Sequence, residues 1–155
     1  MVQPIPEGLG GRIVPYLMID GAAEAIDFYA RAFGATEEAR LTMPDGSIGH
    51  AAIMVHGATV YLSDAPDDMD HEGANPKKLG GTCVLLHQYV SDVDAVASAA
   101  AEAGGRILRE PTDQFYGDRA ALVADPFGHL WSFHTHVRDV SEEEMTEAIE
   151  QMVPQ

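Results

Sequence analysis

Histidines and one arginine are the side chains of this 155-residue chain best suited to chemistry. His134 and His136 lie two residues apart, so a strand would present both on one face, and with His87 they could chelate a divalent metal. Arg119 directly follows Asp118. A guanidinium can clamp an anion or a carbonyl group, but it can equally make a salt bridge with Asp118 or another acid. The residue types therefore suggest an anion clamp or a metal-chelating histidine set.

Common catalytic signatures are absent from the sequence. It contains no nucleophile-elbow motif, zinc-protease motif, phosphate-binding loop or dinucleotide-binding glycine motif. The single cysteine, Cys83, has no activating neighbour and is expected in the core. One cysteine cannot form an internal disulfide, so nothing points to an oxidising compartment. Both a binding protein and an enzyme stay open at this point.

The charge balance excludes some classes of partner. The chain has 9 Lys and Arg against 25 Asp and Glu, which gives a net charge of −16. Such an acidic surface neutralises neither nucleic acid phosphates nor anionic lipids. The longest apolar runs fall far short of the roughly 20 residues that a membrane span needs. No targeting segment is visible at the N-terminus. We expect a cytoplasmic protein that binds neither nucleic acid nor membranes.

Hydrophobic periodicity and turn residues predict an α+β protein in which a βαβββ unit occurs twice. Three glycine pairs that lie 70 or 71 residues apart support the repeat: Gly34 and Gly104, Gly46 and Gly117, and Gly57 and Gly128. In the first unit we expect a helix at 22–33 and strands at 12–19, 38–42, 50–55 and 59–63. In the second unit we expect a helix at 91–103 and strands at 82–90, 106–110, 120–125 and 130–134. We expect one domain over 1–155, with modules at 12–64 and 82–137, a linker at 65–81 and a last helix at 141–152.

Four stretches of the sequence carry a family resemblance. They are VPYLMIDGAAEAIDFYARAFGA (14–35), PDGSIGHAAIMV (44–55), YVSDVDAV (89–96) and FYGDRAALVADPFGHLWSFHTH (115–136). Together they closely resemble the vicinal oxygen chelate superfamily, and within it PhnB-like proteins of the glyoxalase/bleomycin-resistance type. The resemblance covers about residues 12–137. It implies two βαβββ modules with pseudo-twofold symmetry that form a curled mixed sheet around a cleft, with a C-terminal helix added here.

The resemblance also implies where a metal would be held. Metal enzymes of this superfamily take one ligand from the first and one from the last strand of each module. The matching positions here are Val14, Tyr61, Leu85 and Ser132. None is a good ligand for a divalent metal, whereas glyoxalase and dioxygenase chemistry needs His and Glu there. We therefore predict no metal and no other cofactor. The chain resembles the metal-free branch of the family, which includes drug-sequestering proteins.

Strand alternation from these four positions predicts which side chains line the cleft. The candidate ligand-binding residues on the strands are Tyr16, His50, Tyr61, His87, Tyr89, Arg119, Ser132 and His134, and Tyr116 joins them from the loop that enters the cleft. The opposite faces of the strands are apolar and are expected to pack under the helices, with Trp131 in the core. His50 and His87 could equally be hydrogen-bonded structural residues. The expected pocket is mostly aromatic and contains one guanidinium.

Three functions remain compatible with the sequence. The favoured one is a binding protein for a small, partly aromatic or anionic molecule. The alternative is a metal-dependent lyase or isomerase that uses a rearranged histidine set. A third is a homodimer without catalytic activity whose role is to interact with other molecules. The resemblance implies a homodimer, because small proteins of this family usually pair, and the edge strands of each module offer unpaired backbone groups. The linker at 65–81 could permit exchange of modules between subunits.

Overall fold

The computed structural model describes residues 10–65 and 74–152. Its contacts divide the chain into two compact units, Met1–Gly80 and Gly81–Gln155. The first contains β1 (Tyr16–Ile19), α1 (Ala22–Phe33), β2 (Thr36–Thr42), β3 (Ile48–Val55), β4 (Ala58–Asp64) and α2 (Pro76–Leu79). The second contains β5 (Leu85–Tyr89), α3 (Val93–Ala103), β6 (Arg106–Asp113), β7 (Asp118–Ala124), β8 (Leu130–His136) and α4 (Glu142–Met152).

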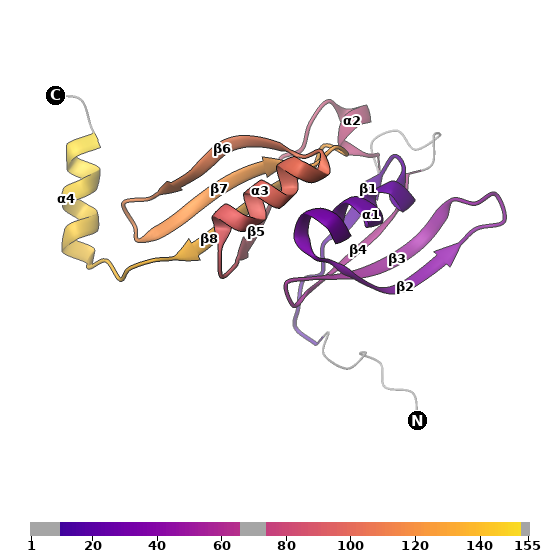
Figure 1. Cartoon of the computed structure of the whole chain (residues 1–155), viewed down its shortest axis with the longest axis horizontal. Coiled ribbons are helices and arrows are strands. Elements are labelled where there is room, and N and C mark those ends of the chain that lie inside the picture. The colour runs from indigo at the N-terminus through magenta and orange to yellow at the C-terminus, as the bar shows by residue number, and fades with distance from the viewer. Residues whose placement is uncertain (1–9, 66–73, 153–155) are drawn as a thin grey trace. The chain divides into compact units, whose positions relative to one another are not determined.

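The two units repeat one topology. The strand order is β1-β4-β3-β2 in the first sheet and β5-β8-β7-β6 in the second. In each sheet the first pair of strands is parallel and the others are antiparallel. Figure 1 shows α3 lying across the strands of its own sheet. The predicted α+β class with two βαβββ units and a C-terminal helix is confirmed.

Each long helix is fixed on one face of its sheet by an apolar stripe and an anchored start. In α1 the stripe includes Ile26, Tyr29 and Phe33, which are all buried. The carboxylate of Asp64 accepts hydrogen bonds from the backbone N–H groups of Gly21 and Ala22 (3.2 and 2.7 Å) and so holds the start of α1 on β4. Each sheet therefore has one face covered by its helix and one helix-free face.

In the second unit, too, a side chain of the last strand accepts a hydrogen bond from the start of the helix. The hydroxyl of Thr135 on β8 accepts a hydrogen bond from the backbone N–H of Val93 (2.9 Å), and Asp92 caps the helix by accepting from the N–H of Ala95. Trp131 and Phe133 of β8 are buried under α3. Trp131 lies in the core as predicted, and its indole N–H donates to the carboxylate of Asp125, 3.0 Å away.

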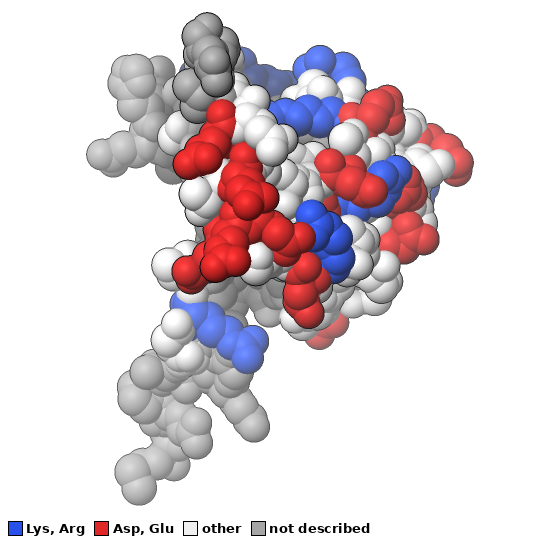
Figure 2. Space-filling view, turned by 90° about the vertical axis from the view of Figure 1, so that its left-hand side faces the viewer, with Lys and Arg blue, Asp and Glu red and all other residues white. Residues whose placement is uncertain are grey.

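The C-terminal helix begins as the sequence predicts. The Ser141 hydroxyl accepts from the N–H of Glu144, whose carboxylate accepts from the N–H of Ser141. No residue of α4 is buried. Figure 2 shows many acidic side chains on the face that it presents, and the first turn of α4 is itself acidic, with Glu142, Glu143 and Glu144. No helix within residues 10–65 and 74–152 is both long and apolar enough to cross a membrane.

Several local expectations are wrong. Strand β1 begins at Tyr16 and not at residue 12, and β5 begins at Leu85 and not at residue 82. Cys83 therefore precedes the strand and is exposed, so it is not a core residue. The segment expected to be only a linker contains α2, where the side chain of Asn75 caps the helix and Pro76 occupies its first turn. Helix α2 and the ends of the short strands β1 and β5 show little hydrophobic periodicity, which is why the sequence pattern did not locate them.

Candidate functional site

The helix-free face of the first sheet carries three rings, which we call the first ring cluster: Tyr16, His50 and Tyr61. Tyr16 on β1 lies opposite Tyr61 on β4. The Tyr16 hydroxyl and His50 Nδ1 are 2.9 Å apart, and the His50 and Tyr61 ring centroids are 5.0 Å apart. Their strand neighbours Leu17 and Leu62 are buried, so alternation places the cluster on the opposite face from α1. The Tyr16 side chain is 46% exposed, and its ring is therefore open to a ligand.

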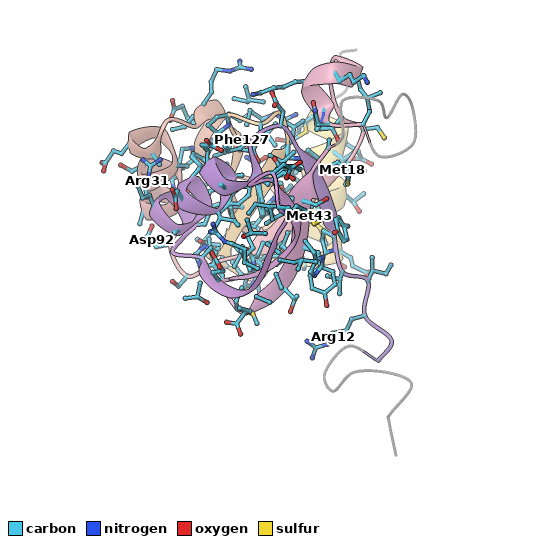
Figure 3. All side chains as sticks on the ribbon, turned by 90° about the vertical axis from the view of Figure 1, so that its right-hand side faces the viewer. Arg12, Met18, Arg31, Met43, Asp92 and Phe127 are labelled. Carbon is cyan, nitrogen blue, oxygen red and sulfur yellow. The ribbon has the colours of Figure 1, made fainter. Side chains whose placement is uncertain are left out.

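A cavity of about 760 Å³ lies in the same unit. Its lining includes Met18, Leu41, Met43 and Ser63. Met18 and Met43, which are labelled in Figure 3, supply flexible thioether side chains to this cavity. Met18 follows Tyr16 at the two-residue interval that keeps both on the helix-free face. The first unit thus combines an exposed ring cluster with a cavity lined by adaptable apolar side chains together with Asp45 and Asp64.

The corresponding face of the second unit is organised by a buried carboxylate. Asp118 is 4% exposed and accepts a hydrogen bond from the Tyr89 hydroxyl at 2.7 Å. Its two oxygens also lie 3.1 Å from His134 Nδ1 and 3.0 Å from His136 Nδ1. Burial alone would raise the pKa of Asp118, but the hydrogen bonds from Tyr89, His136 and His134 outweigh it and lower that pKa. Asp118 is therefore a carboxylate at neutral pH.

Further rings and a hydroxyl surround His134, and we call the group the second ring cluster: His87, Tyr89, Tyr116, Ser132 and His134. Ser132 Oγ lies 3.1 Å from His134 Nε2. The His87 ring centroid is 4.3 Å from that of His134, and Tyr116 stacks at 6.2 Å with an interplanar angle of 22°. Burial, followed by the repulsion that a protonated His134 would exert, lowers the pKa of His87. His87 is therefore neutral at pH 7.

A cavity of about 340 Å³ opens beside this cluster. Tyr116, Ser132 and His134 line it together with Leu85, Arg109 and Gln114. Arg109 has no ion pair among the residues that the structure describes. Burial and the charge of Asp118 raise the pKa of Tyr116, and the positive charge of Arg109 lowers it in part. The second unit therefore offers a hydroxyl, an imidazole, a guanidinium and the carboxylate of Glu110 around one cavity.

Arg119 does not belong to this face, which corrects the prediction from the sequence. It lies opposite Thr135, whereas Ala120 lies opposite His134. Its guanidinium donates to both carboxylate oxygens of Asp94 on α3 at 2.6 and 2.8 Å and to Asp113 at 2.9 Å. These hydrogen bonds raise the pKa of Arg119 still further. The salt-bridge interpretation is the one the structure supports, with Asp94 and Asp113 as partners in place of Asp118.

The error has a physical cause in the other unit. The sequence matches Arg119 to Ile48, and strict alternation places Ile48 on the same face as His50. In the structure Leu41 pairs with His50 but Thr42 pairs with Ile48, so Gly49 is the extra residue of a β-bulge. Ile48 is consequently buried. One residue of shift exchanges the two faces of a strand.

We predict that Arg119→Lys lowers the melting temperature and leaves ligand affinity unchanged, because lysine keeps the charge but loses the two-pronged contact with Asp94. Thermal unfolding and ligand titration on the same variant check this. Weakened binding at an unchanged melting temperature would return Arg119 to the site.

The family resemblance implies a metal at the positions of Val14, Tyr61, Leu85 and Ser132, whose side chains are poor metal ligands. Among the described residues, no group of three or more His, Cys, Asp or Glu side chains is arranged to hold a metal ion. Hydrogen bonds occupy the ring nitrogens of His134 and His136, two members of the histidine set considered from the sequence. His136 turns to Asp118 and Asp139 with its two ring nitrogens, which leaves neither for a site shared with His87.

Sequence reasoning missed Asp118 as the centre of the second cluster. It was considered only as a partner of Arg119. The signal lies in the register of the sheet, since Asp118 pairs with His136 across β7 and β8 and β5 places Tyr89 beside His134. Three strands must be aligned before this carboxylate can be placed.

Comparison with known proteins identifies relatives over most of the chain. The sequence model of the Glyoxalase/Bleomycin resistance protein/Dioxygenase superfamily matches residues 12–133. An uncharacterized protein of Mycobacterium tuberculosis is 45% identical over 136 residues, which cover 87% of this chain and 80% of that protein.

Two solved structures show the same architecture. TioX from Micromonospora sp. ML1 is 30% identical, with a TM-score of 0.65, over 83% of this chain and all of that one. A PhnB protein from Bacillus cereus is 16% identical, with a TM-score of 0.60, over 80% of this chain and 98% of that one, and it shares the fold.

Proposed function

The chain belongs to the glyoxalase/bleomycin resistance protein/dioxygenase superfamily, and from that premise we propose that it binds a small, partly aromatic or anionic molecule without a metal ion. One observation carries the proposal: each unit has a ring cluster on the helix-free face of its sheet and a cavity in the same unit. Ligand sites are typically concave and apolar, with a few polar groups that fix orientation.

The exposure of the rings supports a binding role. Tyr16 is 46% and Tyr89 57% exposed, although both are large aromatic side chains in strands. Aromatic faces stack on flat ligands, and phenol and imidazole groups add hydrogen bonds of fixed direction. Arg109, at the second cavity, supplies a positive charge for an anionic group. The set suits a flat molecule that carries a carboxylate or a similar anion.

The hydrogen bonding of the histidines supports a site without metal. Metal ligation needs a free nitrogen lone pair on each imidazole. His134 uses both nitrogens, on Asp118 and Ser132. His50 engages Nδ1 with Tyr16. A metal would have to break one of the two His134 contacts before that imidazole could bind it.

A thermal-shift screen with aromatic carboxylates, run with and without EDTA, tests the proposal. We expect at least one compound to raise the melting temperature, Tyr16→Ala or Arg109→Ala to reduce that rise, and EDTA to change neither the unliganded melting temperature nor the rise. Ile149→Ala on the exposed face of α4 serves as a control outside the clusters. A fall of several degrees in EDTA would contradict the metal-free site and favour a metal-dependent lyase or isomerase.

We also propose that the protein is a homodimer. The edge strands of both sheets offer unpaired backbone groups, and apolar side chains such as Leu41 and Leu85 are exposed in the single chain. Light scattering at micromolar concentration should give about twice the chain mass of 16.6 kDa. A mass near that of one chain would refute dimerisation and leave the ligand proposal intact.

A further inference from the structure

Three side chains of the second unit form a continuous hydrogen-bonded chain. Ser132 Oγ lies 3.1 Å from His134 Nε2, and His134 Nδ1 lies 3.1 Å from Asp118 Oδ2. Ser132 and His134 are two residues apart on β8, and Asp118 opens the neighbouring strand β7. The distances and the order of the groups match a nucleophile, a general base and a carboxylate that orients the base.

The direction of the protons follows from the carboxylate. An ionised carboxylate only accepts hydrogen bonds, so Nδ1 of His134 must carry the proton that it shares with Asp118. In the neutral imidazole the Nε2 lone pair is then directed at Ser132 Oγ, 3.1 Å away, and the serine hydroxyl is the donor. This tautomer is the one in which an imidazole can take the proton of a serine hydroxyl.

The base and its carboxylate are held in place from several sides. Asp118 is 4% and His134 8% exposed. Tyr89 donates to Asp118, and the rings of Tyr116 and His87 pack against His134. Such support fixes the imidazole in one orientation, which a reactive serine requires.

The serine is accessible to a substrate. Ser132 and His134 line the cavity of about 340 Å³, together with Arg109 and Gln114. The donors that could face a carbonyl oxygen as it gains negative charge are Arg109 and the amide hydrogen of Gln114 that is not donated to the Thr112 carbonyl. Apolar lining from Leu85 and Leu122 leaves room for an acyl chain or a ring.

We propose that Ser132, His134 and Asp118 make the second unit an acyl-transfer site for activated esters. Ser132 Oγ bonds to the ester carbonyl carbon while its proton passes to His134 Nε2. The bond from that carbon to the alcohol oxygen then breaks, and the alcohol leaves with the proton from His134. Water adds to the acyl-serine by the same route, releases the carboxylic acid and restores the hydroxyl. Ser132 and His134 are the catalytic residues, and Asp118 is a positioning residue.

A fluorophosphonate probe tests the nucleophile independently of the ligand proposed above, because it reacts with activated serines whatever their substrate. We expect one probe per chain, located on Ser132 by peptide mass mapping. Ser132→Ala should abolish labelling, while Ser98→Ala, on the exposed side of α3, should leave it unchanged. An unlabelled folded protein, or equal labelling of Ser132→Ala and wild type, would overturn the proposal.

Hydrolysis of p-nitrophenyl acetate tests the roles of the other two residues. Ser132→Ala should lose the activity, and His134→Gln should lower kcat by about 100-fold. Asp118→Asn should lower kcat with little change in KM, because it misorients the imidazole without removing the cavity. The chain has 7 histidines that can hydrolyse this ester weakly. Activity of Ser132→Ala equal to that of the wild type would come from them and would contradict the proposal.

A third variant covers the case in which histidine or aspartate changes disturb folding. In Ser132→Cys the thiol should pass its proton to His134 and react with iodoacetamide at pH 6 at least about 10-fold faster than the exposed Cys83 of the same chain. Equal rates for the two thiols would show that His134 does not activate position 132 and would refute the relay.

Discussion

Phe133→Ala should lower the free energy of unfolding by about 3–5 kcal/mol, measured by urea titration. The Phe133 side chain is fully buried under α3 and stacks on Trp131 with ring centroids 6.0 Å apart. Truncation removes this apolar contact and leaves a cavity in the core. Because a domain of this size is stabilised by only about 5–15 kcal/mol, much of the second unit's stability would be lost.

This change also reports on the site, because Phe133 separates Ser132 from His134 on β8. Phe115→Ala is the matched control, since that ring is only half-buried and contacts Tyr116 outside the sheet. It should cost clearly less. A loss below about 1 kcal/mol for Phe133→Ala would show that α3 does not pack on this face as described.

Asp118→Asn should lower the free energy of unfolding by about 2–3 kcal/mol at pH 6, because a neutral amide replaces the carboxylate that Tyr89, His134 and His136 contact. Urea unfolding of both proteins measures the difference. Asp113→Asn is the control, since its carboxylate makes an exposed ion pair with Arg119 and should contribute little.

The pH dependence of this difference has a defined sign. The pKa of Asp118 is lowered from 3.8, so its contribution is present above about pH 4 and disappears as the pH falls through the lowered value. Hydrogen bonds to Asp118 and Asp139 raise the pKa of His136 above 6.5, so that contribution is complete below pH 6.5 and is lost as the pH rises through the raised value. The difference should be largest between about pH 4 and 6.5. A difference that grows below pH 4 would contradict the assignment.

The repeat could be predicted from the sequence because its signals are local. The helix α1 shows its buried stripe at Ile26, Tyr29 and Phe33, and Gly34 and Gly104 both end helices in the left-handed conformation that favours glycine. The ring clusters followed from strand alternation, which held on β1, β4, β5 and β8. The periodicity of the regular helices and strands therefore predicts both the fold and the strand faces on which most candidate site residues lie.

The rest depended on contacts that no local pattern records. The bulge at Gly49 changed the face of a strand end, so the position of Arg119 was misassigned. The carboxylate of Asp118 meets Tyr89, His134 and His136 only after β5, β8 and β7 are placed in register. A buried carboxylate that contacts residues on several strands can be predicted from the sequence only when the pairing of all three strands is known.

Proton NMR of the histidine rings tests the central claim most directly. The screened aromatic carboxylate that gives the largest thermal shift would be titrated into the protein in the presence of EDTA. The proposal predicts that the signals of His50, His87 or His134 shift in a saturable manner. His56 and His129 lie outside the strands and belong to neither ring cluster, and their signals should stay in place. Movement confined to His56 or His129, with the cluster histidines unchanged at saturation, would contradict a ligand site on the helix-free faces.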